Sequence, residues 1–264
     1  MELPSEAARR AIVTTLARFF DDWEEALGAA DLVLPNGDYF PDAFTSDVES
    51  VERLFKRMCS YVPIASDLSI ALVFVDADDA AEAKHCGSGA CGSGAKLQPT
   101  ACLSEVDGRY VVPLTQGALS NSISLTTALA RSAGALVLAE AGEAYDLGGD
   151  AELAAVACGL GPLLLNGAAV YAKGCGGLTF HQATELDVGE LGFATAVFVN
   201  RFDHKTGKLR DLLPVTQKEA FDSAIHWLNV QTDLNESLRQ RPALLATGLF
   251  EFREKSGFLS RLFG

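Results

Sequence analysis

Apolar residues return every three or four positions along five stretches of the chain, and this spacing predicts an amphipathic helix over each of them. The predicted helices cover residues 6–29, 46–61, 122–140, 184–200 and 216–238. We expect Ser46 to begin the second helix, because acidic residues follow it in the first turn. Asn121 or Ser122 should cap the third helix.

Two shorter stretches have the composition of β-strands. Ser69–Asp76 (SIALVFVD) and Arg109–Leu114 (RYVVPL) are rich in β-branched and large apolar residues. Pro113 has no N–H group to donate to a neighbouring strand. We therefore expect the second strand to lie at an edge of its sheet, or Pro113 to lie at the end of the strand.

An almost wholly apolar run extends from Leu153 to Ala172, with Asn166 as its one polar side chain. A run of this length is long enough to span a bilayer. Glycines and Pro162 interrupt it, however, and it lacks the aromatic residues typical of membrane interfaces. We expect a helix capped by Asp150, kinked near Pro162 and buried on all sides in a protein core, with no membrane span.

These elements predict a helix-rich α+β fold with a small central β-sheet. Residues 1–252 would form a single domain, and residues 253–264 a basic, amphipathic C-terminal tail. The apolar side chains of that tail could bind a partner protein or a second copy of the chain. A loosely held terminus is the alternative interpretation.

Composition excludes some partners. The chain has 264 residues, of which 48% are hydrophobic and 21% charged, and its formal net charge is −14. Nucleic acids and anionic membranes repel a surface this acidic, so we expect neither as the main partner. The chain does not open on a basic segment followed by an apolar one, so we expect a cytoplasmic location.

The six cysteines fall into different settings. Cys59 and Cys158 lie in apolar helical patterns and are expected to be buried, inert thiols. A glycine- and serine-rich loop carries the other candidates, which are His85, Cys86, Cys91 and, further along, Cys102. This loop could hold zinc, form a redox-active disulfide, or be a plain loop, and the spacing leaves all three open.

Common catalytic motifs are absent from the sequence. There is no phosphate-binding P-loop, no dinucleotide-binding glycine pattern and no H-E-x-x-H. The four histidines are scattered, and no two of them share a helix face at i, i+4 spacing. A conventional histidine-rich metal site is therefore not expected.

The order of segments nevertheless resembles one kind of protein. A strand, a looped region and RYVVPL precede a helix entered through GALSNSISL, and ELAAVACGLGPLLLNGA and ELGFATAVFVNRF follow. This order, with YFPDAF and LFKRMCSYV upstream, is similar to that of uncharacterised bacterial proteins related to zincin-type zinc metallopeptidases. The resemblance implies a zincin-like fold, with an H-E-x-x-H helix at LARSAGA (residues 129–135) and a third, acidic ligand at Glu152.

The zinc ligands that the resemblance implies are missing here. Arg131 and Ala135 stand in the two histidine positions, and Ser132 stands in place of the catalytic glutamate. A guanidinium is always protonated and cannot bind a cation, and Ala135 has no donor atom. Glu152 remains, and it could form an ion pair with Arg131. Alternatively, it could simply favour a helix N-terminus.

Three functions are compatible with these observations. The first is a non-catalytic binding or scaffold protein with a degenerate metallopeptidase site. The second is a metal or redox protein that uses the His85, Cys86, Cys91 and Cys102 loop, where zinc would be the cofactor. The third is a hydrolase of another mechanism, for which the sequence offers no recognisable base beside a nucleophile.

Overall fold

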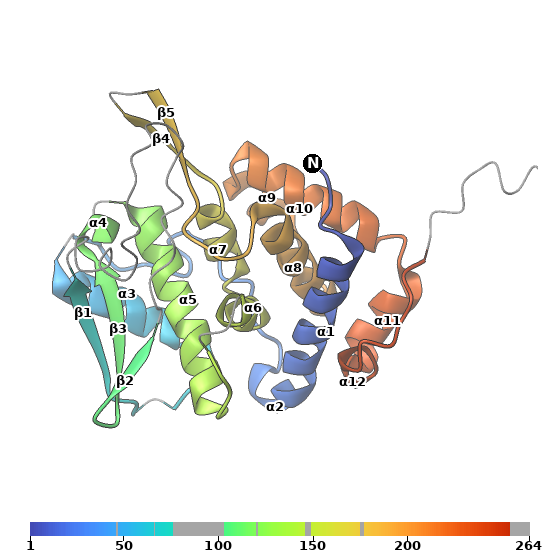
Figure 1. Cartoon of the computed structure of the whole chain (residues 1–264), viewed down its shortest axis with the longest axis horizontal. Coiled ribbons are helices and arrows are strands. Elements are labelled where there is room, and N and C mark those ends of the chain that lie inside the picture. The colour runs from blue at the N-terminus through green and yellow to red at the C-terminus, as the bar shows by residue number, and fades with distance from the viewer. Residues whose placement is uncertain are drawn as a thin grey trace, which may run out of the picture.

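Helices dominate the computed structural model, which describes residues 1–45, 47–65, 67–75, 103–119, 121–145, 149–174 and 177–253 (Figure 1). The first half of the chain contains α1 (Glu6–Asp22), α2 (Glu24–Leu27), α3 (Val48–Cys59), α4 (Gln116–Leu119) and α5 (Ser122–Glu140). The second half contains α6 (Asp150–Ala157), α7 (Gly161–Gly167), α8 (Val188–Arg201), α9 (Gly207–Leu212), α10 (Val215–Leu228), α11 (Thr232–Gln240) and α12 (Pro242–Ala246).

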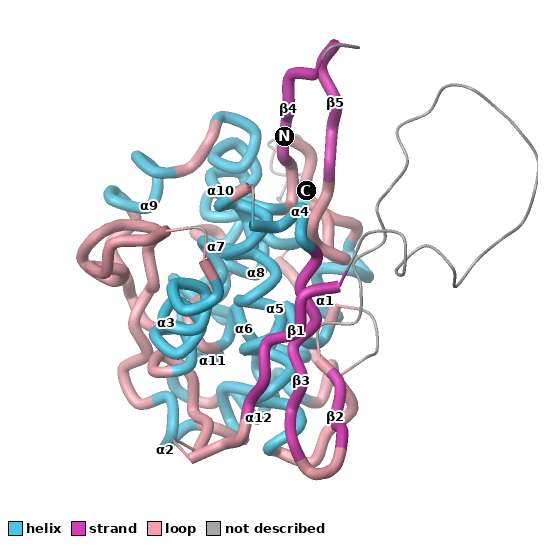
Figure 2. Tube along the Cα trace, turned by 90° about the vertical axis from the view of Figure 1, so that its left-hand side faces the viewer, coloured by secondary structure: helices cyan, strands magenta, loops and turns pink. Residues whose placement is uncertain are grey.

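The strands form one mixed sheet and one hairpin. In the sheet, β3 (Arg109–Thr115) lies between β1 (Ile70–Val75), which runs parallel to it, and β2 (Ser104–Val106), which runs antiparallel. In the hairpin, β4 (Val170–Gly174) pairs with β5 (Gly177–His181) and projects away from the helices (Figure 2). The α+β class is confirmed, but the sheet lies at one side of the described structure and not at its centre (Figure 1).

Pro113 lies in the middle strand of the sheet, two residues before the end of β3, so the edge position, one of the two alternatives predicted, is wrong. In β3, Pro113 is level with Val73 of β1. On the other side, β2 pairs only with the residues from Arg109 to Val111 and ends before the proline. The missing N–H therefore removes no hydrogen bond from the β2 ladder.

Helix α5 lies between the sheet and helices α1, α6, α7 and α8 (Figure 1). Most of its residues are buried, and its side chains join α1, α3, α6, α7, α8 and the sheet in one hydrophobic core. Asn121 caps it as predicted, since the Asn121 side chain accepts hydrogen bonds from the N–H groups of Ile123 and Ser124. By length and composition α5 could cross a membrane, but 67% of its most apolar window is buried inside this fold.

Three long helices expected from the periodicity are interrupted. The first breaks at Trp23, between α1 and α2, and the last breaks after Leu228, between α10 and α11. The apolar run from Leu153 to Ala172 is not one kinked helix but α6, α7 and the start of β4. Gly159 causes the first break in that run, because its φ of +87° is a left-handed conformation that ends α6.

Several helix starts also differ from expectation. Asp47, and not Ser46, caps α3 by accepting a hydrogen bond from the Ser50 N–H group. The residue before α6 is Gly149, so Asp150 is the first helical residue and not the cap. Helix α8 begins at Val188, later than predicted, because Asp187 and Glu190 form a reciprocal capping box there.

Candidate functional site

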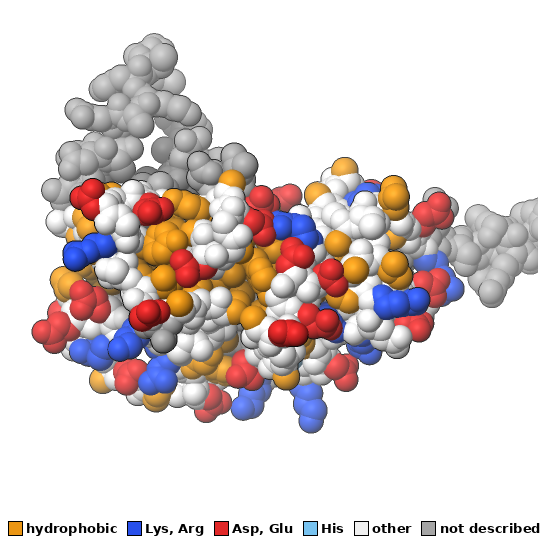
Figure 3. Space-filling view, turned by 90° about the horizontal axis from the view of Figure 1, so that it is seen from below, with side chains coloured by type: hydrophobic (Ala, Val, Ile, Leu, Met, Phe, Trp, Pro, Cys, Tyr) orange, Lys and Arg blue, Asp and Glu red, His pale blue; other side chains and the backbone are white. Residues whose placement is uncertain are grey.

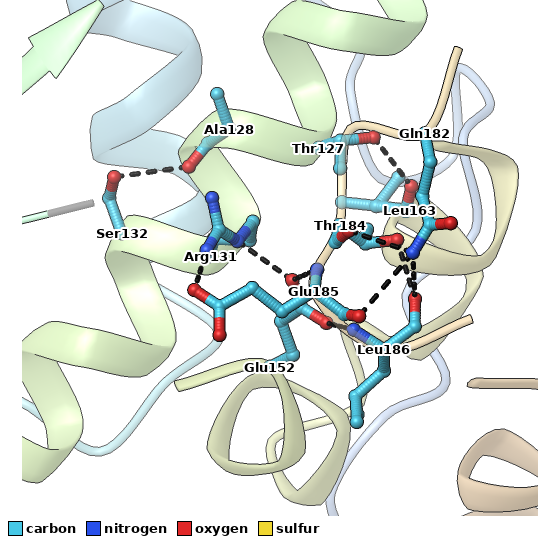
Figure 4. Close-up of polar contacts among 10 residues, drawn as sticks. All are labelled: Thr127, Ala128, Arg131, Ser132, Glu152, Leu163, Gln182, Thr184, Glu185 and Leu186. Atoms are coloured by element: carbon cyan, nitrogen blue, oxygen red, sulfur yellow. Dashed lines mark hydrogen bonds and ion pairs between the residues drawn. The ribbon is translucent and has the colours of Figure 1, made fainter. Parts of the chain in front are cut away.

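Arg131 and Glu152 form a buried ion pair between α5 and α6 (Figure 4). The Arg131 Nε lies 2.8 Å from the Glu152 Oε1, and the two side chains are 6% and 1% exposed. The Nε–H bond does not point at the carboxylate, so the contact is electrostatic and not an aligned hydrogen bond. The structure thus contains the contact that the sequence offered as one of two interpretations of Glu152.

Small residues allow α5 and α6 to approach closely enough for this contact. Gly134 in α5 faces α6, and a Cβ atom added there would lie 1.9 Å from the carbonyl oxygen of Ala151. It would also lie 2.9 Å from the Cβ of Ala155. Any side chain at Gly134 would therefore push the two helices apart.

The Glu152 carboxylate also fixes the segment that leads into α8. Its Oε1 accepts a hydrogen bond from the backbone N–H of Glu185 at 2.7 Å, and its Oε2 accepts one from Leu186 at 2.9 Å. The Arg131 Nη2 donates to the Oε1 of Glu185 at 2.9 Å. One arginine and two glutamates thus connect α5, α6 and the backbone before α8 (Figure 4).

Burial and these contacts together set the pKa of the Glu152 carboxyl group. Burial raises the pKa of Glu152 above the ordinary glutamate value, and this is the largest effect on the group. The Arg131 guanidinium and the two backbone N–H groups act in the opposite direction, because they stabilise the carboxylate. The network is therefore a balance between the cost of burying a charge and the contacts that surround that charge.

The remaining residues of the predicted degenerate pocket are packed into the core. Ser132 is 1% exposed, and its Oγ donates a hydrogen bond to the Ala128 carbonyl oxygen. Ala135 is completely buried. A histidine at Ala135 would have to displace core side chains.

Glu185 belongs to the network but was not singled out in the sequence. It lies in a segment without regular structure, and nothing in its neighbours distinguishes it from a solvated surface acid. The other candidates, His85, Cys86, Cys91 and Cys102, lie outside the described residues, as does the tail from residue 254. Within the described ranges, no three His, Cys, Asp or Glu side chains are placed to hold a metal ion.

Two cavities lie on opposite faces of α3. The first, which we call the α3–α5 cavity, has a volume of about 350 Å³ and lies between α3, the loop of residues 35–44, the start of α5 and the end of α7. The second has a volume of about 640 Å³ and lies between α3, the segment after it and β1. Neither cavity is lined by Arg131, Ser132, Ala135 or Glu152.

The α3–α5 cavity has an apolar interior and a charged mouth. Leu125 and Leu163 form buried parts of its wall and are each 1% exposed. Arg53 and Arg57 line it from the exposed side of α3. An interior of this kind with a few polar groups at its opening is typical of small-molecule sites.

The second cavity contains Cys59, which belongs to α3. Burial raises the pKa of the Cys59 thiol to about 12. Cys158 is 1% exposed, and burial raises the pKa of its thiol as well. Both are free thiols; Cys158 is buried as predicted, whereas Cys59 is only half-buried, and the raised pKa values are consistent with the prediction that both are inert.

Comparison of the chain with protein-family models, with curated proteins and with solved structures finds no significant match.

On the face of the protein seen in Figure 3, acidic side chains do not gather in one place. Figure 3 shows acidic side chains scattered over the face seen from below, with basic and apolar side chains between them. Against this acidic background, the described lining of the α3–α5 cavity contains two arginines and a single carboxylate, that of Asp42. The mouth of the cavity thus has the opposite sign of charge from the protein as a whole.

Proposed function

We propose that this chain is a non-catalytic binding protein with a zincin-like scaffold, and that the α3–α5 cavity is its ligand site. The cavity carries the proposal, because it combines buried apolar walls with a charged opening within one set of helices. The degenerate zinc site would be a structural junction. The binding function would reside elsewhere on the fold.

The Arg131–Glu152 contact supports the non-catalytic part of this proposal. Activating a water molecule for hydrolysis needs a metal or a base with free lone pairs beside the substrate. Glu152 directs both carboxylate oxygens at backbone N–H groups and at Arg131. Arg131 has no lone pair to offer to a metal.

The order of elements supports the zincin-like part. The mixed sheet precedes α5, and α6 brings Glu152 against the third residue of the LARSAGA segment. This is the juxtaposition that the resemblance implies for a metal-binding helix and its acidic third ligand. A fixed cation, Arg131, then takes the place of a divalent metal beside the same carboxylate.

Metal analysis of the purified full-length chain tests the first point. We expect Glu152→Gln to leave the zinc content of the protein unchanged, because the proposal places no metal between α5 and α6. Stoichiometric zinc that is lost in Glu152→Gln would contradict the proposal. Zinc that is lost only in Cys86→Ser/Cys91→Ser would instead support a metal-binding cysteine loop as a separate feature.

Titration with octan-1-ol, followed by NMR of the ¹⁵N-labelled chain, tests the ligand site. We expect shifts at the start of α5 and along α3, and we expect Leu54→Trp to abolish them because the larger ring fills the cavity. Leu244→Trp is the matched control, since Leu244 is 51% exposed on α12. Equal binding by the wild type and a folded Leu54→Trp variant would contradict the proposed site.

A further inference from the structure

The α3–α5 cavity is organised from one end to the other. One face of α3 contributes Ser50, Arg53, Leu54 and Arg57, which recur at helical spacing and therefore point the same way. The opposite wall comes from α5 and α7, where Ile123, Leu125 and Leu163 are apolar and Ser122, Thr126 and Asn166 are polar. A ligand inside would lie between the guanidinium groups of α3 and the leucine side chains of α5 and α7.

The two arginines are only lightly engaged within the described structure. The Arg53 Nη2 donates to the Ser50 Oγ at 2.7 Å and Arg53 also attracts the nearby Asp47 carboxylate, while the Arg57 Nη2 lies 3.4 Å from the Oδ2 of Asp42. Each guanidinium has five N–H donors in a planar fork that matches a carboxylate. Both residues are exposed, so their side chains can turn toward a ligand at little cost.

The N-terminus of α5 adds to the positive electrostatic potential of the two arginines. Ser122 and Ile123, in the first turn of this 19-residue helix, line the cavity. The Asn121 side chain already accepts from two N–H groups of that turn, so the helix contributes its dipole more than free donors. Among the lining residues, two arginines and one aspartate leave one unit of positive charge, and the helix N-terminus adds a partial positive charge to it.

The volume limits the size of the occupant. One water molecule takes up about 30 Å³ in the liquid, so the cavity would hold about a dozen non-hydrogen atoms. Neither a nucleotide nor a peptide of several residues fits within that size. A short hydrocarbon chain with one polar head does fit.

We infer that the α3–α5 cavity binds a medium-chain carboxylate, with its head between Arg53 and Arg57 and its hydrocarbon chain against Leu125 and Leu163. This inference rests on the proposed binding function and adds the class of ligand to it. A single negative charge matches the surplus at the mouth, and the forked donors match a carboxylate. The apolar walls exclude water from around the hydrocarbon chain.

Calorimetric titration of the full chain with octanoate and with octan-1-ol tests the inference. We expect octanoate to bind about tenfold or more tightly than octan-1-ol, because only octanoate gains charge-assisted hydrogen bonds. Arg53→Gln/Arg57→Gln should remove that advantage and leave octan-1-ol binding unchanged. Raising the salt concentration should weaken octanoate binding alone, since both arginines are exposed.

Arg109→Gln/Arg241→Gln is the matched control, because it changes the net charge by the same amount at exposed positions that do not line the cavity. It should leave octanoate binding as in the wild type. If Arg53→Gln/Arg57→Gln leaves octanoate binding unchanged, the carboxylate inference is overturned. Binding of octan-1-ol would in that case still support the cavity as the ligand site. Failure of both ligands to bind would overturn the proposed function as well, and much tighter binding of octyl phosphate would overturn the ligand class.

Discussion

Arg131 and Glu152 show how a charged pair can be maintained at a nearly inaccessible point. Moving both charges out of water costs free energy, which their attraction and the hydrogen bonds from Glu185 and Leu186 offset. The net contribution of such a pair to stability is small, but the loss of one partner is expensive. Its specific effect here is to hold α5, α6 and the segment before α8 in one arrangement.

We predict that Arg131→Met lowers the free energy of unfolding by about 3–5 kcal/mol, because Glu152 then remains buried without its cation. Chemical denaturation at neutral pH measures this. Arg210→Met is the control, since the Arg210–Asp222 pair is exposed and should contribute about 1 kcal/mol or less. A similar cost for both variants would contradict the role assigned to the buried pair.

The cost of Arg131→Met should depend on pH. Burial raises the pKa of Glu152, so the folded state binds a proton on this group more readily than the unfolded state does. A group of this kind contributes stability at low pH and loses it as pH rises through its folded-state pKa. Denaturation at several pH values should therefore show a larger cost at pH 7 than near pH 4, and Arg131→Met/Glu152→Gln should flatten the dependence.

Cys59 should be unreactive in the folded protein even though it lines a cavity. With a pKa of about 12, its thiolate fraction at pH 8 is about one part in ten thousand, against about a quarter for an ordinary thiol. Native alkylation with iodoacetamide followed by peptide mass spectrometry should leave Cys59 and Cys158 unmodified. Both should react in denaturant, and rapid native labelling of Cys59 would contradict the raised pKa of its thiol.

At this scale the sequence predicted part of the network. Arg131 and Glu152 stand out because each lies in a helix otherwise almost devoid of charge, so a shared contact is a natural expectation. Glu185 and the two cavity arginines have no such distinction. Arg53 and Arg57 read as ordinary surface charges until the fold places the loop of residues 35–44 opposite them.

At the scale of helices and strands, close contacts between helices depend on glycines. Gly134 allows α5 to rest directly on the backbone of α6, and Gly192 does the same for α8 against Ala220 of α10. A Cβ at Gly192 would lie 2.9 Å from the Cβ of Ala220. In these places the absence of a side chain determines the distance between helices.

Gly134→Ala should therefore destabilise the protein, although alanine is the better helix former. We expect a loss of about 1–3 kcal/mol, because the added methyl group would overlap the Ala151 carbonyl oxygen. Gly207→Ala is the matched control, since a Cβ there meets no atom within 4 Å at the start of α9. Thermal denaturation should show that control unchanged or slightly stabilised.

The sequence predicted where helices occur better than where they end. Periodicity depends on the apolar face, which continues across a short break such as the one from Asn229 to Gln231 between α10 and α11. There the Asn235 side chain donates to the Leu228 carbonyl oxygen and satisfies the end of α10. Such a contact depends on the tertiary fold. So does the β4–β5 hairpin, whose first strand begins inside the apolar run and was therefore predicted as helix.

At the scale of the whole molecule, the two ends of the described chain pack against each other. Residues 249–253 pack along α1, where the guanidinium of Arg9 lies over the rings of Trp227 and Phe252 and that of Arg10 lies over Phe250. Gln231 holds the same segment, since its side chain both donates to and accepts from the backbone of Arg253. The last described residues are therefore part of the fold.

Two deletions separate this packing from the tail beyond it. Removing residues 249–264 should lower the free energy of unfolding by about 2 kcal/mol or more, because Phe250 and Phe252 lose their half-buried positions. Removing residues 257–264 leaves every one of those contacts in place and should keep stability within about 0.5 kcal/mol. Equal destabilisation by both deletions would contradict this division.

The shorter deletion also tests the predicted role of the C-terminal tail. If the tail binds a second copy of the chain, sizing of the 257–264 deletion by light scattering should show a smaller assembly than the wild type. An unchanged mass would remove self-association as its role. The single domain over residues 1–252 remains a prediction, and the shared core of α1, α5, α8 and α10 is consistent with it.

The hydrogen bonds to Glu152 give the protein a built-in reporter. The amides of Glu185 and Leu186 lie outside any helix or strand, where amide protons ordinarily exchange with solvent quickly. Because a buried carboxylate holds both, they should exchange as slowly as amides of the surrounding helices. Two resonances in one short loop would then record each opening of the segment before α8 from α6, long before the protein unfolds as a whole.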